Sequence, residues 1–143
     1  MIDLQRRFDM SDRLDLRQPL VLAVDDNEDN LQLLSELLLL CQCSVITATN
    51  GATTILKAKN SQPNLILLDM MLPDISGIEV ANCLKLDSQT KSIPIVAVTA
   101  MARLEDLDRF VLAGCVECVT KPYNIDDLEA IIRKYILADK LMQ

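Results

Sequence analysis

Short apolar runs alternate with longer helical patterns from residue 20 onward, and this alternation constrains the fold more than any other feature. The runs cover residues 20–24, 44–48, 65–68, 95–98 and 116–120. Continuous apolar runs of this length, bounded by Pro, Gly, Asn and Asp, are typical of strands buried on both faces. The sequence therefore predicts five buried strands.

A helical pattern follows each of these runs. The predicted helices cover about residues 28–41, the stretch from Gly51 to the residue before Pro63, residues 78–86 and residues 103–113, which Gly114 ends as a C-terminal cap. In the last helix, apolar residues recur at i, i+3, i+4, i+7 and i+8, namely Leu128, Ile131, Ile132, Tyr135 and Ile136. Strands alternating with helices predict an α/β fold, a doubly wound parallel sheet covered on both faces. A length of 143 residues fits one domain.

Charge and hydropathy exclude several classes of function. A net charge of -7 argues against nucleic-acid binding, which requires a basic surface. No apolar run approaches the roughly 20 residues that span a bilayer. Residues 1–18 mix both signs of charge with no continuous apolar segment, so we expect a flexible arm rather than a secretory signal. The expected location is the cytoplasm, with no membrane partner.

The residue types exclude imidazole chemistry, because the chain contains no His. Five cysteines include two close pairs, Cys41 with Cys43 and Cys115 with Cys118, which are possible zinc ligands. We expect small buried thiols, with a shared zinc site and a redox role for Cys115 and Cys118 as the alternatives.

Polar residues stand at the carboxyl ends of four predicted strands. Asp25 and Asp26 end the first, Asp69 the third, Thr99 the fourth, and Lys121 the fifth. Ligands of open parallel sheets bind beyond these strand ends. Three clustered carboxylates repel one another and predict a hard divalent ion, Mg²⁺ or Mn²⁺. One carboxylate is then available to attack phosphorus, with Lys121 and Thr99 contacting the phosphoryl oxygens.

Each of these residues has an ordinary structural explanation when taken alone. Asp25 and Asp26 are also good helix caps, lysines such as Lys121 are mostly solvated, and Thr99 suits any strand. Their joint placement at neighbouring strand ends favours a functional site.

Four segments in order resemble the response-regulator receiver domain, the partner of histidine kinases in two-component signalling. They are Val-Asp-Asp at 24–26, Leu-Leu-Asp-Met-Met-Leu-Pro at 67–73 with Gly77, Val-Thr-Ala at 98–100, and Thr-Lys-Pro-Tyr at 120–123. The resemblance covers about residues 18–140 and is closest to stand-alone, chemotaxis-regulator-like receivers. It implies a receiver domain over residues 19–143.

The resemblance also implies a fold and a set of roles. The fold is flavodoxin-like, with strand order 2-1-3-4-5 and a cis Lys121-Pro122 bond. This implied strand order places the two cysteine pairs at opposite edges of the sheet, which disfavours a shared zinc site. A magnesium ion is held by Asp25, Asp26, Asp69 and the Met71 carbonyl. Asp69 accepts a phosphoryl group from a phosphohistidine donor, and Thr99, Ala100 and Lys121 contact that group. The only chemistry expected is the chain's own phosphorylation and dephosphorylation.

One feature departs from the family pattern. The position three residues before the lysine, where the family has an aromatic switch residue, is Cys118. Coupled rotation of Thr99 and an aromatic ring is therefore not expected, and output by another movement of residues 103–120 stays open. Met71 and Met101 are bulky and apolar two residues beyond Asp69 and Thr99. We expect them to slow loss of the phosphoryl group.

The helix over residues 28–41 has two leucine stripes. One consists of Leu31, Leu34 and Leu38, and the other of Leu33, Leu37 and Leu40. One stripe must pack on the sheet, and the last helix covers the second or leaves it for a partner. In the receiver family this helix binds the phosphodonor, so a histidine kinase or histidine phosphotransfer protein is expected to contact it through Leu31, Leu34 and Leu38.

Three functions compete. The first is a response regulator that passes its signal to a downstream protein by contact, with phosphorylation-driven homodimerisation left open. The second is an interaction module that works without phosphorylation, although the complete acidic set disfavours it. The third is a Mg²⁺-dependent phosphohydrolase, which Met71 disfavours because haloacid-dehalogenase-type phosphatases have a second acid at that position.

Overall fold

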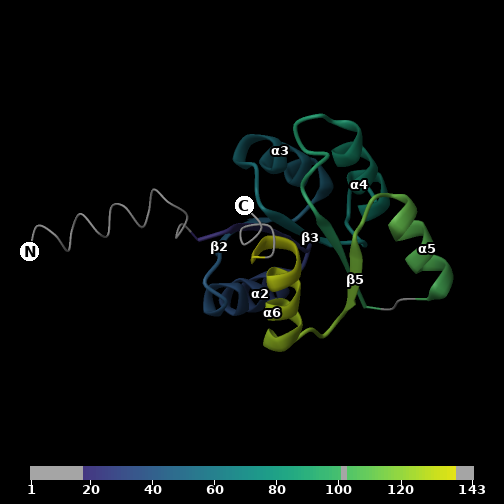
Figure 1. Cartoon of the computed structure of the whole chain (residues 1–143). Helices are drawn as coiled ribbons and strands as arrows, with labels where there is room; N and C mark the ends of the chain where they lie inside the picture. Colours follow the sequence, from purple (N-terminus) through teal and green to yellow (C-terminus); the bar gives the residue numbers. More distant parts are fainter. Residues whose placement is uncertain (1–17, 101–102, 138–143) are drawn as a thin grey trace, which may run out of the picture.

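The computed structural model describes residues 18–100 and 103–137 of the chain. Its elements, in order, are β1 (Leu20–Val24), α2 (Glu28–Leu40), β2 (Ser44–Ala48), α3 (Gly51–Ser61), β3 (Leu65–Asp69), α4 (Gly77–Leu86), β4 (Ile95–Thr99), α5 (Leu104–Leu112), β5 (Glu117–Thr120), α6 (Ile125–Ile132) and the π-helical turn η1 (Arg133–Leu137) (Figure 1). The predicted arm, apart from Gln18, and Met101 lie outside the described residues.

The five strands form one parallel sheet in the order β2-β1-β3-β4-β5. This is the predicted doubly wound topology, and the strand order 2-1-3-4-5 is confirmed. Because β1 and β3 are central neighbours, residues that follow β1 lie beside residues that end β3. The topology therefore brings Asp25, Asp26 and Asp69 to the same edge of the sheet.

Alternate residues of each strand enter two separate cores. Leu22, Ile66 and Ile95 belong to a cluster with residues of α3, α4 and α5. Val21, Leu65 and Val96 belong to a second cluster with residues of α2 and α6. In Figure 1, α2 and α6 accordingly lie together, apart from α3, α4 and α5. The central strands are buried on both faces, which explains their continuous apolar sequence.

The α2 leucines correct one prediction. Leu31, Leu34 and Leu38 are buried against the sheet and α6, with exposed fractions of 6%, 2% and 0%. They are part of the core, so the prediction that a partner contacts these three side chains is wrong. On the other stripe, Leu37 is half-buried, whereas Leu33 and Leu40 are 54% and 69% exposed.

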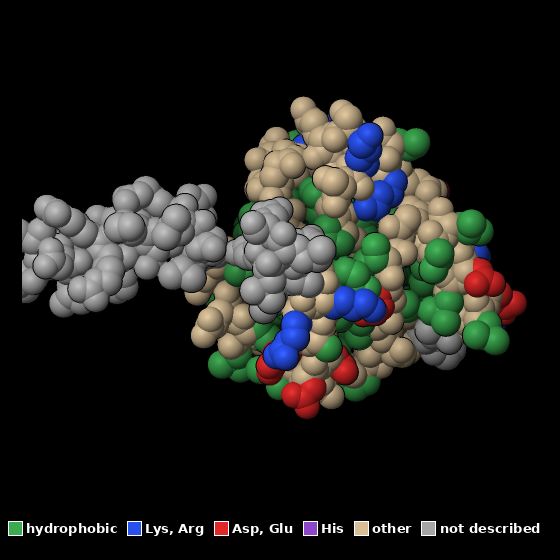
Figure 2. Space-filling model, in the orientation of Figure 1, with side chains coloured by type: hydrophobic (Ala, Val, Ile, Leu, Met, Phe, Trp, Pro, Cys, Tyr) green, Lys and Arg blue, Asp and Glu red, His purple; other side chains and the backbone are tan. Residues whose placement is uncertain are grey.

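Side-chain caps begin most of the helices. Asn27, Asn50, Ser76 and Asn124 each accept a hydrogen bond from a backbone N–H in the first turn of α2, α3, α4 and α6. Arg103, at the N-cap of α5, makes no such bond, and the one buried residue of α5 is Phe110. Figure 2 shows apolar and acidic side chains exposed over this helix. Among the described helices, α5 is therefore the least anchored.

Several element ends differ from the prediction. The apolar runs 65–68 and 95–98 each extend by one residue, so Asp69 and Thr99 are the last residues of β3 and β4, the strand ends at which they were expected. The reason is pairing, since Asp69 lies opposite Val98 and Thr99 opposite Thr120. The last helix changes to a π-helical turn at Arg133, yet Ile136 remains buried, so the predicted apolar stripe is preserved.

The cysteine pairs lie at opposite edges of the sheet, as the strand order requires. Cys41 and Cys43 precede β2, whereas Cys115 and Cys118 lie before and within β5. All five cysteines are free thiols. Within residues 18–100 and 103–137, the cysteines form no metal-binding group.

Within the described part of the chain, the helices are too short or too polar to cross a bilayer.

Candidate functional site

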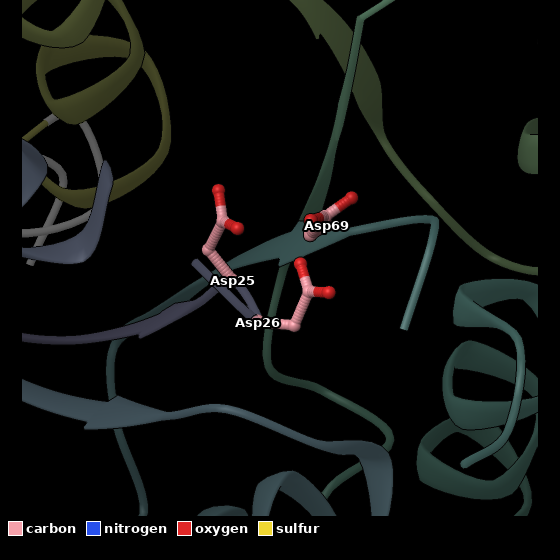
Figure 3. Close-up of side chains that lie close together, drawn as sticks. All are labelled: Asp25, Asp26 and Asp69. Atoms are coloured by element: carbon pink, nitrogen blue, oxygen red, sulfur yellow. The ribbon is translucent and has the colours of Figure 1, made fainter. Parts of the chain in front are cut away.

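Three carboxylates meet where β1 and β3 end. Asp25 and Asp26 follow β1, and Asp69 is the last residue of β3. Each offers an oxygen within 4.8 Å of the others (Figure 3). Asp25 and Asp69 are buried, with 2% and 4% of their surface exposed, whereas Asp26 is exposed. The site is therefore open to solvent on the Asp26 side and closed beneath.

Asp25 accepts hydrogen bonds from three residues. Its Oδ1 accepts the Asn27 N–H at 2.9 Å, and its Oδ2 accepts the Asn30 amide at 3.4 Å and the Lys121 ammonium at 2.7 Å. Burial by itself raises the pKa of Asp25, but the bonds from Lys121 and Asn27 outweigh burial and lower it. Asp25 is therefore an anionic anchor of the site.

Asp69 is less well compensated. Its Oδ1 accepts the Met71 N–H at 2.9 Å, and its Oδ2 lies 3.5 Å from the Lys121 ammonium. Burial raises the pKa of Asp69, the Met71 N–H and Lys121 oppose that effect, and the Asp25 charge adds to it. The net direction is upward. The Lys121 charge at 3.5 Å therefore does not fully offset the burial of Asp69 and the nearby Asp25 charge.

Lys121 extends to this site from the end of the edge strand β5. It follows β5, and its backbone N–H donates to the Thr99 carbonyl at 2.8 Å. The Lys121-Pro122 bond is cis, as expected. Thr99 is 7% exposed and Ala100, directly after β4, is exposed. The fold thus brings the lysine to the two central carboxylates and places Thr99 and Ala100 at the same edge.

Cys118, at the position of the family's aromatic switch, is half-buried on β5. Met71, two residues beyond Asp69, is exposed. Cys118 packs against the α3, α4 and α5 core and lines a groove of about 360 Å³ between β5 and α6. The Met71 side chain is 76% exposed, two residues beyond Asp69. Met101 lies outside the described residues.

The acidic group fits a hard divalent cation. Three carboxylates and one ammonium leave a formal charge of about two negative units if all are ionised, so Lys121 alone does not neutralise the group. Carboxylate and carbonyl oxygens are the ligands that Mg²⁺ takes in proteins. The oxygen-only donor set excludes a thiolate-selecting metal here.

Some site residues escaped the sequence analysis. Asn27 and Asn30 contact Asp25, and Tyr123 lies close enough that burial and the Asp25 and Asp69 charges raise its pKa to about 12. Asp74 lies outside the site and bonds the start of α3 from 23 residues further along the chain. Only the Asn at the start of α2 had a sequence signal, as a cap. The other contacts depend on tertiary packing.

A doubly wound parallel sheet with an acidic cluster and a lysine beyond its strand ends defines a class of phosphoryl-transfer signalling domains. The family model of the response regulator receiver domain matches residues 21–133. This chain belongs to the response-regulator receiver family and therefore to two-component signalling. Receiver domains have histidine kinases as partners and are generally not enzymes in their own right.

Known proteins agree with this assignment. The polar-differentiation response regulator DivK of Brucella anthropi is 35% identical over 116 residues, which cover 81% of this chain and 94% of DivK. The chemotaxis protein CheY4 of Vibrio cholerae has a TM-score of 0.79 at 27% identity, covering 83% of this chain and 99% of CheY4.

A third relative shares the fold. The receiver domain of the sensor histidine kinase PA1611 from Pseudomonas aeruginosa has a TM-score of 0.78 at 24% identity and covers 83% of this chain and 98% of its own. That protein has a magnesium ion coordinated in its active-site cleft. In this chain, Asp25, Asp26 and Asp69 place carboxylate oxygens close enough together to hold a metal ion.

Proposed function

We propose that this chain is a response regulator that accepts a phosphoryl group on Asp69 from a phosphohistidine donor. The observation that carries the proposal is the position of Asp69. Its carboxylate ends a central strand, is 4% exposed, and lies beside two further carboxylates and the Lys121 ammonium. A buried carboxylate in an acidic cluster that is not fully neutralised is suited to share a divalent cation with its neighbours and to receive a phosphoryl group beside that cation.

Magnesium is the proposed cofactor, with manganese as a substitute. Asp25, Asp26, Asp69 and the Met71 carbonyl would hold it, as the receiver family implies and as the magnesium in the PA1611 receiver domain supports. When bound, the ion supplies positive charge to the non-bridging phosphoryl oxygens.

Phosphoryl transfer requires mainly that the Asp69 carboxylate and the donor phosphorus are correctly positioned. An Asp69 carboxylate oxygen attacks phosphorus, the O–P bond forms, and the P–N bond to the donor histidine breaks with the electron pair returning to nitrogen. Lys121 now lies 2.7 Å from Asp25 and 3.5 Å from Asp69, so a short movement brings its ammonium to a phosphoryl oxygen. The Thr99 hydroxyl donates to another, beside Ala100.

The donor is a histidine kinase or a histidine phosphotransfer protein, and we propose that it docks on the exposed face of α2. Leu33 lies on that face in a shallow depression that it forms with Asp29, Gln32 and Glu36. An apolar centre with a polar rim suits a transient protein contact. Leu33 replaces the buried leucines in this role.

The signal leaves through contact with a downstream protein in the cytoplasm. Because Cys118 stands at the switch position, the proposed movement is of α5 and β5 without an aromatic ring. A phosphorylation-dependent homodimer is a further outcome that this movement permits. We assign residues 19–143 to the receiver domain and residues 1–18 to an arm.

Met71 and Met101 are proposed to prolong the phosphorylated state. Attacking water must approach phosphorus past the residue two positions beyond Asp69, and an apolar side chain there disfavours it. Met71→Asn is expected to accelerate loss of the phosphoryl group, because a polar side chain there can position the attacking water. An unchanged decay rate would contradict this role.

Labelling by a small phosphodonor tests the central proposal. Purified protein is incubated with acetyl phosphate, with Mg²⁺ or with EDTA, and intact mass is followed. Wild type should gain one phosphoryl mass only with Mg²⁺, and Asp69→Asn should gain none. Asp87→Asn, which removes a carboxylate far from the site, should label like wild type. A wild type that stays unlabelled, or an Asp69→Asn variant that labels equally, would overturn the proposal.

A further inference from the structure

The loop from Met70 to Ser76 connects β3 to α4 and contains the Met71 carbonyl, a proposed magnesium ligand. The Met71 side chain is 76% exposed, so its packing does not hold this peptide in place. At one end the Met71 N–H donates to Asp69 Oδ1 at 2.9 Å. At the other, the Gly77 N–H donates to the Met70 carbonyl at 3.2 Å. The loop is therefore closed at its base, and its tip needs a separate anchor.

Asp74 supplies that anchor by bonding a different element. Its Oδ1 accepts the Gly51 N–H at 2.8 Å, and its Oδ2 accepts the Ala52 N–H at 3.0 Å. These amides are the first two of α3, and the next, that of Thr53, bonds the Asn50 side chain at 2.8 Å. Helix N-termini leave such amides unpaired unless something caps them. Here the helix is capped jointly by its own Asn50 and by the loop.

Packing beside these bonds is tight. A Cβ added at Gly51 would lie 2.3 Å from Ile75 Cγ1, and one added at Gly77 would lie 2.6 Å from Met70 Cα. The loop therefore rests on α3 through Ile75 and on the end of β3 through Gly77. The hydrogen bonds from Gly51 and Ala52 also lower the pKa of Asp74.

We infer that Asp74 is a positioning residue for the metal site, because its bidentate contact with the start of α3 holds the loop in the conformation from which the Met71 carbonyl binds Mg²⁺. The inference rests on the proposed function. A ligand that is already ordered loses less conformational freedom when the ion binds, so the anchor raises affinity. Removing a residue that orients a metal ligand typically lowers the affinity for the metal by about 10–100-fold.

Calorimetric titration of metal-free protein with Mg²⁺ tests the role of Asp74. Asp74→Ala should weaken binding by about tenfold, and Asp74→Asn, which keeps one acceptor oxygen, by less. The acetyl phosphate labelling rate at saturating Mg²⁺ should stay within about twofold of wild type, because Asp74 touches neither the metal nor the phosphoryl group. Asp87→Ala is the matched control, since Asp87 also accepts a backbone N–H, from Gln89 at 2.9 Å, and should leave Mg²⁺ affinity unchanged.

A second measurement uses the unmodified protein. Because coupling is reciprocal, Mg²⁺ should slow hydrogen exchange at the Gly51 and Ala52 amides, whereas the Gln89 amide should exchange at the same rate with and without the ion. This readout serves even if Asp74→Ala fails to fold.

The outcomes separate the two proposals. Wild type that binds no Mg²⁺ would overturn the proposed function and this inference together. Wild type that binds Mg²⁺ and labels on Asp69, with an Asp74→Ala affinity within twofold or with Gly51 and Ala52 exchange unaffected by the ion, would overturn the inference alone.

Discussion

At the residue scale, Lys121 is the positive charge that makes the acidic site tolerable. Its ammonium lies between two buried carboxylates, at 2.7 Å from Asp25 and 3.5 Å from Asp69, and its own side chain is 22% exposed. Removing it leaves buried charge without its hydrogen-bonded partner, which costs more than the loss of an exposed ion pair.

Lys121→Met is therefore expected to destabilise the protein more in EDTA than with Mg²⁺. In EDTA it should lower the free energy of unfolding by about 1–3 kcal/mol, because Asp25 loses its closest cation. With Mg²⁺ the loss should shrink, since Lys121 and the metal share the same carboxylates and the variant binds the ion more tightly. Thermal melts with and without Mg²⁺ measure both. Equal melting temperatures of variant and wild type in EDTA would contradict the assigned role of this lysine.

Cysteine reactivity is a second property decided by single residues. Burial, with a smaller effect of Cys118, raises the pKa of Cys115 to about 11, and burial also raises the pKa of Cys118. The thiolate is the reactive form, so these environments disfavour the redox alternative for this pair. By contrast, Cys83 is exposed.

Alkylation by iodoacetamide should follow this order. At pH 8, about one Cys115 thiol in a thousand is ionised, so folded protein should be modified at Cys83 while Cys115 stays unmodified. The folded pKa lies above the unfolded value of about 8.5, so this thiol favours folding below pH 8.5 and loses that contribution as the pH rises toward 11. Peptide mass spectrometry across pH 7–10 measures the modification. Rapid labelling of Cys115 in folded protein at pH 8 would contradict its environment.

At the element scale, the helices differ in how firmly their ends are held. α6 has a reciprocal capping box between Asn124 and Asp127, whereas α5 begins at Arg103 without a side-chain cap. α5 also has only Phe110 fully in the core and several exposed apolar side chains, such as Leu104 and Leu112. Weak anchoring makes α5 the element that moves at the least cost in free energy.

Introducing a cap at Arg103 tests this account. Arg103→Ser should raise the free energy of unfolding by about 1 kcal/mol and slow hydrogen exchange in α5, because the serine hydroxyl can accept a first-turn N–H. Lys91→Ser makes the same change of charge at an exposed turn and serves as the control. Urea unfolding with exchange measurements compares the two. Unchanged exchange in α5 would show that its N-terminus is not what limits its order.

At the scale of the whole molecule, one sheet separates two cores, and both depend on strands that contribute to each face in turn. Leu38 on α2 is 0% exposed in one of these cores, while Leu33 on the same helix is 54% exposed. The two leucines share residue type and element and differ only in the direction that they face.

Alanine substitution should affect stability at Leu38 and phosphoryl transfer at Leu33. Leu38→Ala should destabilise the protein by about 2–5 kcal/mol through lost burial and a cavity. Leu33→Ala should stay within about 0.5 kcal/mol of wild type and instead slow phosphoryl transfer from the histidine donor. Chemical unfolding gives the first comparison and transfer kinetics the second. A large stability loss in Leu33→Ala would contradict the assignment of the two faces.

The strands and the residues at their ends could be predicted from the local sequence pattern. The apolar runs predicted five strands in the correct positions, because burial on both faces of a parallel sheet leaves an apolar sequence with few alternatives. The strand-end residues Asp25, Asp26, Asp69, Thr99 and Lys121 could likewise be grouped from sequence, since parallel strands place their carboxyl ends at one edge.

Tertiary structure alone decided the rest, because those features join elements that are distant along the chain. Which leucine stripe of α2 faces the sheet depends on how the helix is rotated against β1 and α6, and both stripes have the same helical spacing. The preference of Lys121 for Asp25 over Asp69 spans 96 residues, and the hold of Asp74 on α3 spans 23. Local pattern cannot encode such contacts, since their energy exists only once the chain has brought both partners together.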